Sequence, residues 1–252
     1  MNENDNQTPP GMSKPSVAPD PGVSNRSSIT TRDVAAIARR LYAEGPVFQR
    51  TLKQLRPHIC PFEDLIVQVP RDSSVLDVGC GAGMFLALLA SFGRLGEGHG
   101  IDVNQAAIDL ANRMTNKLDA ATPLRFERVD PEDPWPEGAF DVVCMIDVMH
   151  HIAPGQQAAV FEQAGSRLRP GGLFLYKDMA ERPLWQAWAN RLHDLVLARE
   201  WIHYLPLADA LSHAADAGFE VIVQGGASRL WYAHEWVIFR LADKSAASDL
   251  QF

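Results

Sequence analysis

The chain has 252 residues, of which 46% are hydrophobic, enough for one α/β domain with a full core. Its net charge of −8, without any run of Lys or Arg, argues against a nucleic-acid substrate and gives no support for binding anionic lipid. Cys60, Cys80 and Cys144 lack the spacing of a disulfide framework or zinc site, so we expect no metal and a cytoplasmic protein with free thiols. We expect neither a signal peptide nor a membrane span.

The N-terminal third predicts a leader followed by helices. Residues 1–28 are rich in Asn, Pro, Ser and Asp, which predicts a disordered leader. Apolar residues then recur at helical spacing, and a threonine at position 30 or 31 can cap a helix that ends near residue 43. A second, short helix is expected over 48–55, before Pro57 breaks it. We expect residues 29–70 to form a helical cover.

From residue 73 the pattern alternates between short apolar strands and helices. The expected strands are 75–78, 100–103, 125–129, 140–146 and 173–176, and the expected helices are 84–92, 104–117 and 154–168. Residues 169–172 (RPGG) predict a turn. Strands that alternate with helices predict an α/β fold with a doubly wound, mostly parallel sheet.

The last third has a different composition. Three of the six tryptophans lie in an expected helix over 184–201, and a further helix is expected over 207–217. Two closing strands, over 219–223 and 235–241, bring the sheet to seven strands, the final one antiparallel. We expect the tail over 244–252 to be frayed.

The strongest motif is a glycine-rich turn after the first expected strand. Gly79, Gly81 and Gly83 follow VLDV at alternate positions, where glycine lets the backbone approach a ligand. Asp77 lies inside the apolar strand, so its expected partner is a cationic or hydrogen-bond-donating ligand group. Asp102 ends the next strand 19 residues after Gly83, where α/β cofactor folds place an acid against ribose hydroxyls. A plain strand–helix connection is the alternative.

The spacing of the glycines separates classes of nucleotide-binding site. The chain has G-x-G-x-G, whereas a dinucleotide site has G-x-G-x-x-G and a P-loop has a Lys and a Ser or Thr after its glycines. The pattern therefore disfavours a dehydrogenase and a phosphate-binding loop.

Four segments together resemble the class I S-adenosylmethionine-dependent methyltransferases. They are VLDVGCGAGMF, GHGIDVNQAAI, RFERVDPEDPWPEGAFDVVCMIDVMHHI and LRPGGLFLYKD. The resemblance covers about 73–179 and implies a Rossmann-like core there. It also implies a methyltransferase domain over 29–243, with lid helices in 183–217 and closing strands in 219–241.

The resemblance implies roles for individual residues in binding S-adenosylmethionine or its product, S-adenosylhomocysteine. Asp77 would hold the amino end of the methionine part. Asp102 would take the ribose hydroxyls, and Asp130 the adenine amino group. The other implied cofactor-binding residues are Gly79, Cys80, Gly81, Gly83, Val103, Pro131, Ile146 and Asp147.

Catalytic candidates follow the fourth and fifth expected strands. His150 and His151 lie where this family places the transferred methyl group, and histidine is a base near neutral pH. The alternative is that one of them caps a helix or makes a hydrogen bond in the core. Asp178 could orient or deprotonate an acceptor, and the alternative is a surface ion pair with Lys177 or Arg182.

Aromatic residues outside these motifs could bind an apolar acceptor. A packing face is the alternative. The candidates are Tyr42, Trp185, Trp188, His193, Tyr204 and Trp231.

The predicted function is methyl transfer to oxygen, nitrogen or carbon of a small or medium-sized, partly apolar acceptor. An enzyme that uses the same cofactor for another reaction, such as a cyclisation, and a non-catalytic cofactor-binding partner subunit are the alternatives. Only a small-molecule partner is expected, and the oligomeric state stays open.

Overall fold

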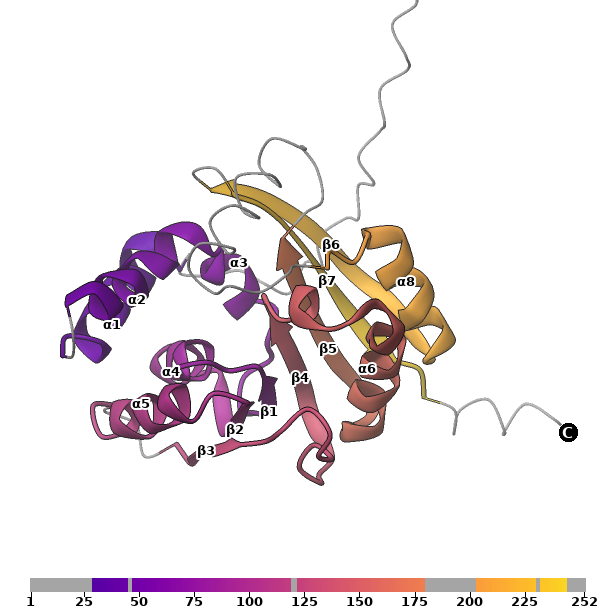
Figure 1. Cartoon of the computed structure of the whole chain (residues 1–252), viewed down its shortest axis with the longest axis horizontal. Helices are drawn as coiled ribbons and strands as arrows, with labels where there is room; N and C mark the ends of the chain where they lie inside the picture. The colour runs from indigo at the N-terminus through magenta and orange to yellow at the C-terminus, as the bar shows by residue number, and fades with distance from the viewer. Residues whose placement is uncertain (1–28, 45–46, 119–121, 180–202, 230–231, 244–252) are drawn as a thin grey trace, which may run out of the picture.

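A computed structural model describes residues 29–44, 47–118, 122–179, 203–229 and 232–243. Within them, seven strands form one sheet in the order β3-β2-β1-β4-β5-β7-β6 (Figure 1). All neighbouring strands are parallel except β7, which is antiparallel to both β5 and β6. The strands are β1 (Ser73–Val78), β2 (Leu95–Asp102), β3 (Leu124–Arg128), β4 (Phe140–Ile146), β5 (Leu168–Met179), β6 (Phe219–Arg229) and β7 (Tyr232–Leu241). The predicted fold class is confirmed.

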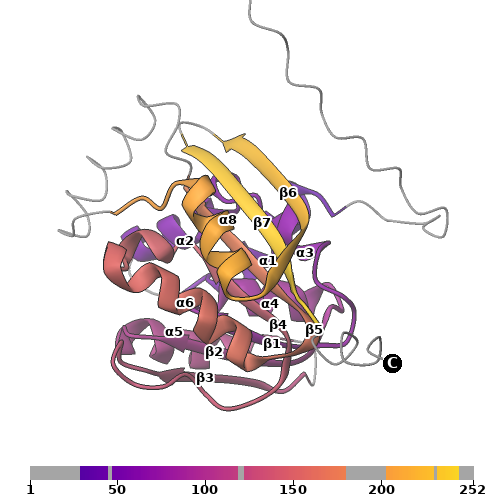
Figure 2. The same cartoon turned by 90° about the vertical axis from the view of Figure 1, so that its right-hand side faces the viewer.

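Helices cover both faces of the sheet. They are α1 (Thr31–Leu41), α2 (Val47–Ile59), α3 (Phe62–Ile66), α4 (Met84–Ser91), α5 (Gln105–Thr115), η1 (Met149–His151), α6 (Pro154–Arg167) and α8 (Leu207–Asp216). The helices α4 and α5 lie on one face and α6 and α8 on the other (Figures 1 and 2). Alternate residues of β4 therefore join different cores: Cys144 packs with the first pair and Val143 with the second. No helix among the described residues is long and apolar enough to cross a membrane.

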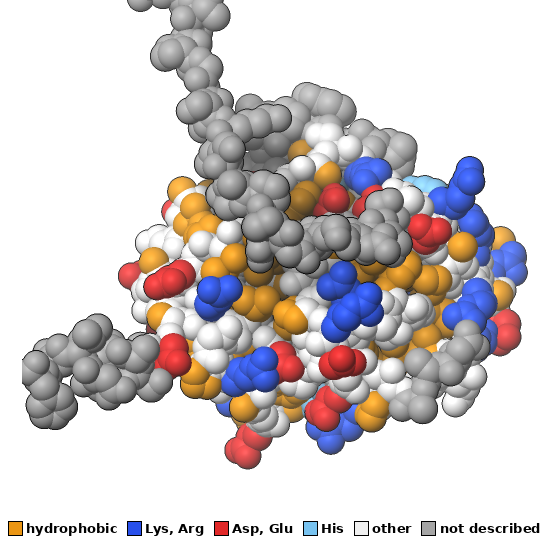
Figure 3. All heavy atoms as spheres, turned by 180° about the vertical axis from the view of Figure 1, so that it is seen from behind, with side chains coloured by type: hydrophobic (Ala, Val, Ile, Leu, Met, Phe, Trp, Pro, Cys, Tyr) orange, Lys and Arg blue, Asp and Glu red, His pale blue; other side chains and the backbone are white. Residues whose placement is uncertain are grey.

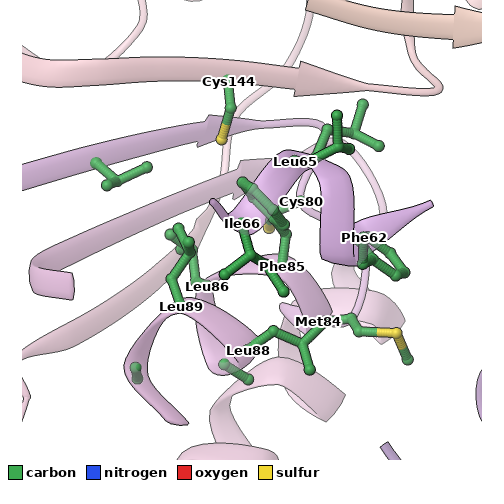
Figure 4. Close-up of a cluster of buried hydrophobic side chains, with 14 of the residues drawn as sticks. Phe62, Leu65, Ile66, Cys80, Met84, Phe85, Leu86, Leu88, Leu89 and Cys144 are labelled. Carbon is green, nitrogen blue, oxygen red and sulfur yellow. The ribbon is translucent and has the colours of Figure 1, made fainter. Parts of the chain in front are cut away.

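The burial of helix α4 explains the position of the N-terminal helices α1 and α3. Every residue from 84 to 90 is buried, so the helix needs apolar partners on all sides. The sheet covers one side, and α1 and α3 contact the helix on other sides. Figure 4 shows the side chains of α3 against those of α4. The rings of Phe62 and Phe85 stack there, with centroids 6.1 Å apart. Helices α1 and α3 are thereby fixed against the helix that follows the glycine-rich turn.

Two helix starts are set by side-chain caps that the sequence predicts. Thr30, rather than Thr31, caps α1 and accepts a hydrogen bond from the Asp33 amide. Asn104 caps α5 through its side-chain oxygen, which accepts from the amides of Ala106 and Ala107 at 3.0 and 3.2 Å.

Several predicted boundaries are wrong. Helix α2 continues to Ile59 with Pro57 inside it, because a proline in the last turn removes one hydrogen bond and the amide of Cys60 still bonds Arg56. Residues 169–172 form an irregularity within β5 rather than a turn before it. Strands β6 and β7 are longer than predicted because they pair with each other along their length. Helix α3 was not predicted.

Three predicted segments lie outside the described residues. They are the leader over 1–28, the helix over 184–201 with its three tryptophans, and the tail over 244–252.

Candidate functional site

The carboxyl ends of β1, β2, β4 and β5 meet at one edge of the sheet, where ligands of open α/β folds bind. Register brings the predicted residues together there. Asp77 of β1 lies opposite Cys144 of β4, and Ile146 of β4 lies opposite Lys177 of β5. The glycine-rich turn follows β1, and η1 follows β4 at the same edge.

The glycine-rich turn has a backbone shape that requires glycine. Gly79 has φ +71°, and a Cβ there would lie 2.3 Å from Cγ2 of Val148. Gly81 has φ +55°, but a Cβ there would meet no atom within 4 Å. The Gly79 and Cys80 amides donate to the Ile101 carbonyl at 2.8 and 2.9 Å. The turn is therefore tied to the end of β2 and leaves open space above Gly81.

Asp77 is a buried carboxyl group beside a small cavity. It is 3% exposed, and the thiol of Cys144 donates to its Oδ1 at 3.3 Å. Burial raises the pKa of Asp77 to about 7, helped by the negative charge of Asp102 and opposed by Cys144 and Arg56. The cavity has a volume of about 40 Å³, and its walls include Gly79, Cys80, Ile146, Arg56 and Phe62. A thiol is a weak donor, so this carboxyl group is under-satisfied.

Asp102 holds the turn and the start of α5 at the same time. Its Oδ2 accepts from the Gly81 amide at 2.7 Å, and its Oδ1 accepts from the Asn104 amide at 2.8 Å. Val103 beside it is 55% exposed. Asp130 is half-buried and pairs with Arg128, and Pro131 is exposed. These residues form an accessible rim that begins at the glycine-rich turn.

Asp147 is the centre of a buried charge network. Its backbone has φ +58°, which is uncommon for a residue other than glycine. Its carboxylate pairs with Lys177, whose side chain is fully buried, and with Arg56 of α2 at 3.0 Å. Burial alone would raise the pKa of Asp147, but Lys177 and Arg56 hold it well below the ordinary range. The network ties the helical cover to the end of β4.

His150 and Asp178 form a buried pair. His150 Nδ1 lies 2.5 Å from Asp178 Oδ1, and both side chains are 4% exposed. The amides of His150 and Met179 also donate to the Asp178 carboxylate, at 3.0 and 2.7 Å. His151 is exposed, with its ring centroid 4.2 Å from that of His150. The alternative of an ion pair between Asp178 and Lys177 is wrong, because consecutive strand residues point to opposite faces.

The predicted acceptor residues are only partly described. Tyr42 is buried, and its hydroxyl donates to the Ala82 carbonyl in the glycine-rich turn at 2.7 Å. Tyr204 is half-buried and follows His203, whose amide donates to the His150 carbonyl at 2.8 Å. The other four candidates, Trp185, Trp188, His193 and Trp231, lie outside the described residues. Among the described residues, no group of three or more His, Cys, Asp or Glu could hold a metal ion.

This geometry agrees with the result of comparison with known families. The profile of a methyltransferase domain matches residues 48–224, which is more than half of the chain. The chain belongs to this methyltransferase family. The resemblance to class I S-adenosylmethionine-dependent methyltransferases is confirmed, and S-adenosylmethionine as cofactor follows from that membership.

Relatives of this methyltransferase act on oxygen, as their names state. It is 29% identical over 150 residues to 27-O-demethylrifamycin SV methyltransferase of Amycolatopsis mediterranei, with 58% of this chain and 53% of the relative covered. It is 35% identical over 124 residues to a fatty-acid O-methyltransferase of Mycolicibacterium smegmatis, with 49% and 43% covered. The chain thus matches about half the length of these curated relatives.

Solved structures share the fold of this methyltransferase. The magnesium protoporphyrin IX methyltransferase of Synechocystis, solved with bound S-adenosylhomocysteine, superposes with a TM-score of 0.62 at 20% identity. The superposition covers 82% of this chain and 93% of that one.

Three residues of the methyltransferase site were missed in the sequence. Cys144 contacts Asp77, Lys177 neutralises Asp147, and Arg56 reaches the site from α2. A lysine inside an apolar strand is a signal that could have identified Lys177. Cys144 and Arg56 carry no such signal, since their roles depend on strand register and on the docking of α2.

Proposed function

We propose that this chain is a cytoplasmic enzyme that transfers a methyl group from S-adenosylmethionine to an oxygen of a small, partly apolar acceptor. One observation carries the proposal: an under-satisfied buried carboxyl group and a buried His–Asp pair share the carboxyl edge of the sheet. The buried carboxyl group of Asp77 fits a cationic ligand group. The pair of His150 and Asp178 fits removal of a proton from a hydroxyl group.

The residues at the edge fit the cofactor. Asp77 would accept hydrogen bonds from the ammonium group, because a cation in the cavity would supply the donors that Cys144 does not. Gly81 leaves room for the methionine chain against the backbone, beside Gly79, Cys80 and Ile146. When bound, the cofactor supplies an electrophilic methyl group on a sulfonium sulfur.

The nucleoside part would lie on the accessible rim. Asp102 is already held by the amides of Gly81 and Asn104, which fixes its position for two ribose hydroxyls. Val103 presents an exposed apolar surface to the adenine. Asp130 and Pro131 would bound the far side of the base.

We assign the carboxylate end of the cofactor to Arg56. The guanidinium lines the Asp77 cavity and is oriented by Asp147, which Lys177 holds ionised. An arginine has five N–H donors in a fixed plane, so one guanidinium can bind two carboxylates at once. Asp147 then acts through Arg56, which revises the direct contact implied by the family resemblance.

His150 is the proposed general base. Asp178 accepts from three donors, one of them Nδ1 of the imidazole, and so fixes the orientation of the ring, as a catalytic base requires. The proton of the acceptor hydroxyl passes to His150 as the new carbon–oxygen bond forms. His151, exposed beside it, is the second candidate.

Two assays test the proposal. Calorimetry with S-adenosylmethionine and S-adenosylhomocysteine should give micromolar binding, and Asp102→Ala should weaken it strongly while the protein stays folded. Mass spectrometry with hydroxylated and carboxylated amphiphilic acceptors should then detect methylated product. Binding without any methylated product would favour another reaction or a non-catalytic subunit. Binding of NADH alone would refute the proposal.

A further inference from the structure

A second concave site lies between the end of α1, the start of α2 and the helix α5. It has a volume of about 520 Å³, which is within the range of small-molecule pockets. None of its lining residues borders the cavity beside Asp77. The methyl-transfer proposal therefore leaves this cleft unexplained.

The cleft is rich in positive charge. Arg50, Lys53, Arg113 and Lys117 line it together with one acid, Glu44, which pairs with Lys117 at 3.0 Å. Among the described residues, no carboxylate pairs with the other three cations. Basic side chains gather along the edge of the molecule that carries α1 and α2, on the right in Figure 3. The cleft thus offers three unpaired cations in a chain of net charge −8.

The helical cover as a whole shares this charge. Residues 31–59 contain six basic and two acidic side chains. Lys53 is also partly withdrawn from water, and burial lowers its pKa. Desolvated cations attract an anion more strongly than solvated ones, because the local dielectric constant is lower.

The floor of the cleft is apolar. Leu41 and Tyr42 are each 2% exposed and Met114 is 1% exposed, and Leu110 adds a partly buried side chain. A purely ionic ligand such as inorganic phosphate would use the cations but not the apolar surface that Ala106 and Leu110 present above this floor. An apolar body attached to an anionic group would satisfy both.

We propose that the cleft binds an anionic amphiphile, a molecule with a carboxylate or phosphate headgroup on an apolar body. The headgroup pairs with Arg50, Lys53 and Arg113, and the body packs on Ala106 and Leu110, above the buried Leu41 and Met114. Tyr42 lines the cleft and donates to Ala82 in the glycine-rich turn, so the ligand lies one side chain from the cofactor site without occupying it.

The test is calorimetric titration of the full chain with decanoate and with decyl phosphate, both below their micelle concentrations. We expect one bound molecule per chain for at least one of them, and the tighter one identifies the headgroup. The double variant Lys53→Gln/Arg113→Gln should lose at least tenfold in affinity. Arg39→Gln, which removes an exposed cation of α1 outside the cleft, should bind as wild type does.

Two further measurements make the result specific. Added salt should weaken decanoate binding, and 1-decanol, which lacks the charge, should bind at least tenfold more weakly. Saturating S-adenosylhomocysteine should leave the amphiphile bound. Equal affinity of the double variant and the wild type, or displacement by S-adenosylhomocysteine, would overturn the proposal. Equal melting temperatures of the variants exclude misfolding as the cause of a loss.

Discussion

Replacing Asp77 by Asn should make the unliganded protein more stable, and more so at high pH. Burial raises the pKa of this carboxyl group from 3.8 to about 7, so the folded state keeps a proton that the unfolded state has released. The stability that the protonated form contributes is fully present below pH 3.8 and is lost as the pH rises to about 7. Asn keeps the shape and has no charge to bury.

The size of the effect follows from that pKa difference. A rise of about three units corresponds to roughly 4 kcal/mol above pH 7, since one unit is worth about 1.4 kcal/mol. Part of the loss occurs below pH 5.5. Between pH 5.5 and 8.5, the wild type should therefore lose about 2 kcal/mol relative to Asp77→Asn.

Urea unfolding of both proteins at the two pH values measures this difference. Taking the difference between the unfolding free energies of the variant and the wild type removes the contribution of all other titrating groups, which both proteins share. A difference that stays constant within about 0.5 kcal/mol, well below the expected 2 kcal/mol, would refute the assignment of a raised pKa to Asp77. Asp109→Asn, which removes an exposed carboxylate of α5, is the matched control for the loss of one acidic group.

Three further predictions concern the same edge of the sheet. Binding of S-adenosylhomocysteine near pH 7 should release about half a proton, because Asp77 ionises beside the ammonium group. Calorimetric heats of binding in buffers of different ionisation enthalpy measure this release. Zero release would contradict the role of Asp77 in binding the ammonium group. His150→Gln should lower kcat about 10²–10⁴-fold with little change in S-adenosylhomocysteine affinity, whereas His151→Gln should stay near wild type; the reverse order would exchange their roles. Lys177→Met should destabilise the fold by about 3 kcal/mol, since it leaves Asp147 buried with less compensation; the double variant with Asp147→Asn should recover part of the loss in urea unfolding.

The seven-stranded fold could be predicted because its signals are local. Strands β1 and β4 are short apolar runs, and the helices that follow β2 and β4 have starts marked by Asn104 and Pro154. The predictions failed where neighbours decide a boundary. Helix α2 runs past Pro57, and β6 runs to Arg229, because pairing and packing offset what the local sequence disfavours.

The net charge of the chain does not predict where charged side chains gather on the folded surface. A net charge of −8 gives no support for binding anionic lipid, but folding places Arg50 and Lys53 of one helix opposite Arg113 of another. A sum over residues cannot contain that arrangement, since it depends on the packing of α2 near α5.

The sequence by itself determined the class of the protein and the position of the glycine-rich turn. It also identified the acids on either side of that turn, Asp77 and Asp102. Those features depend on residues close together in the chain. The tertiary structure alone decided the partners: Cys144 for Asp77, Lys177 and Arg56 for Asp147, and His150 for Asp178. These contacts join residues 28 to 91 positions apart, and their energies depend on burial and register, which exist only once the sheet has formed.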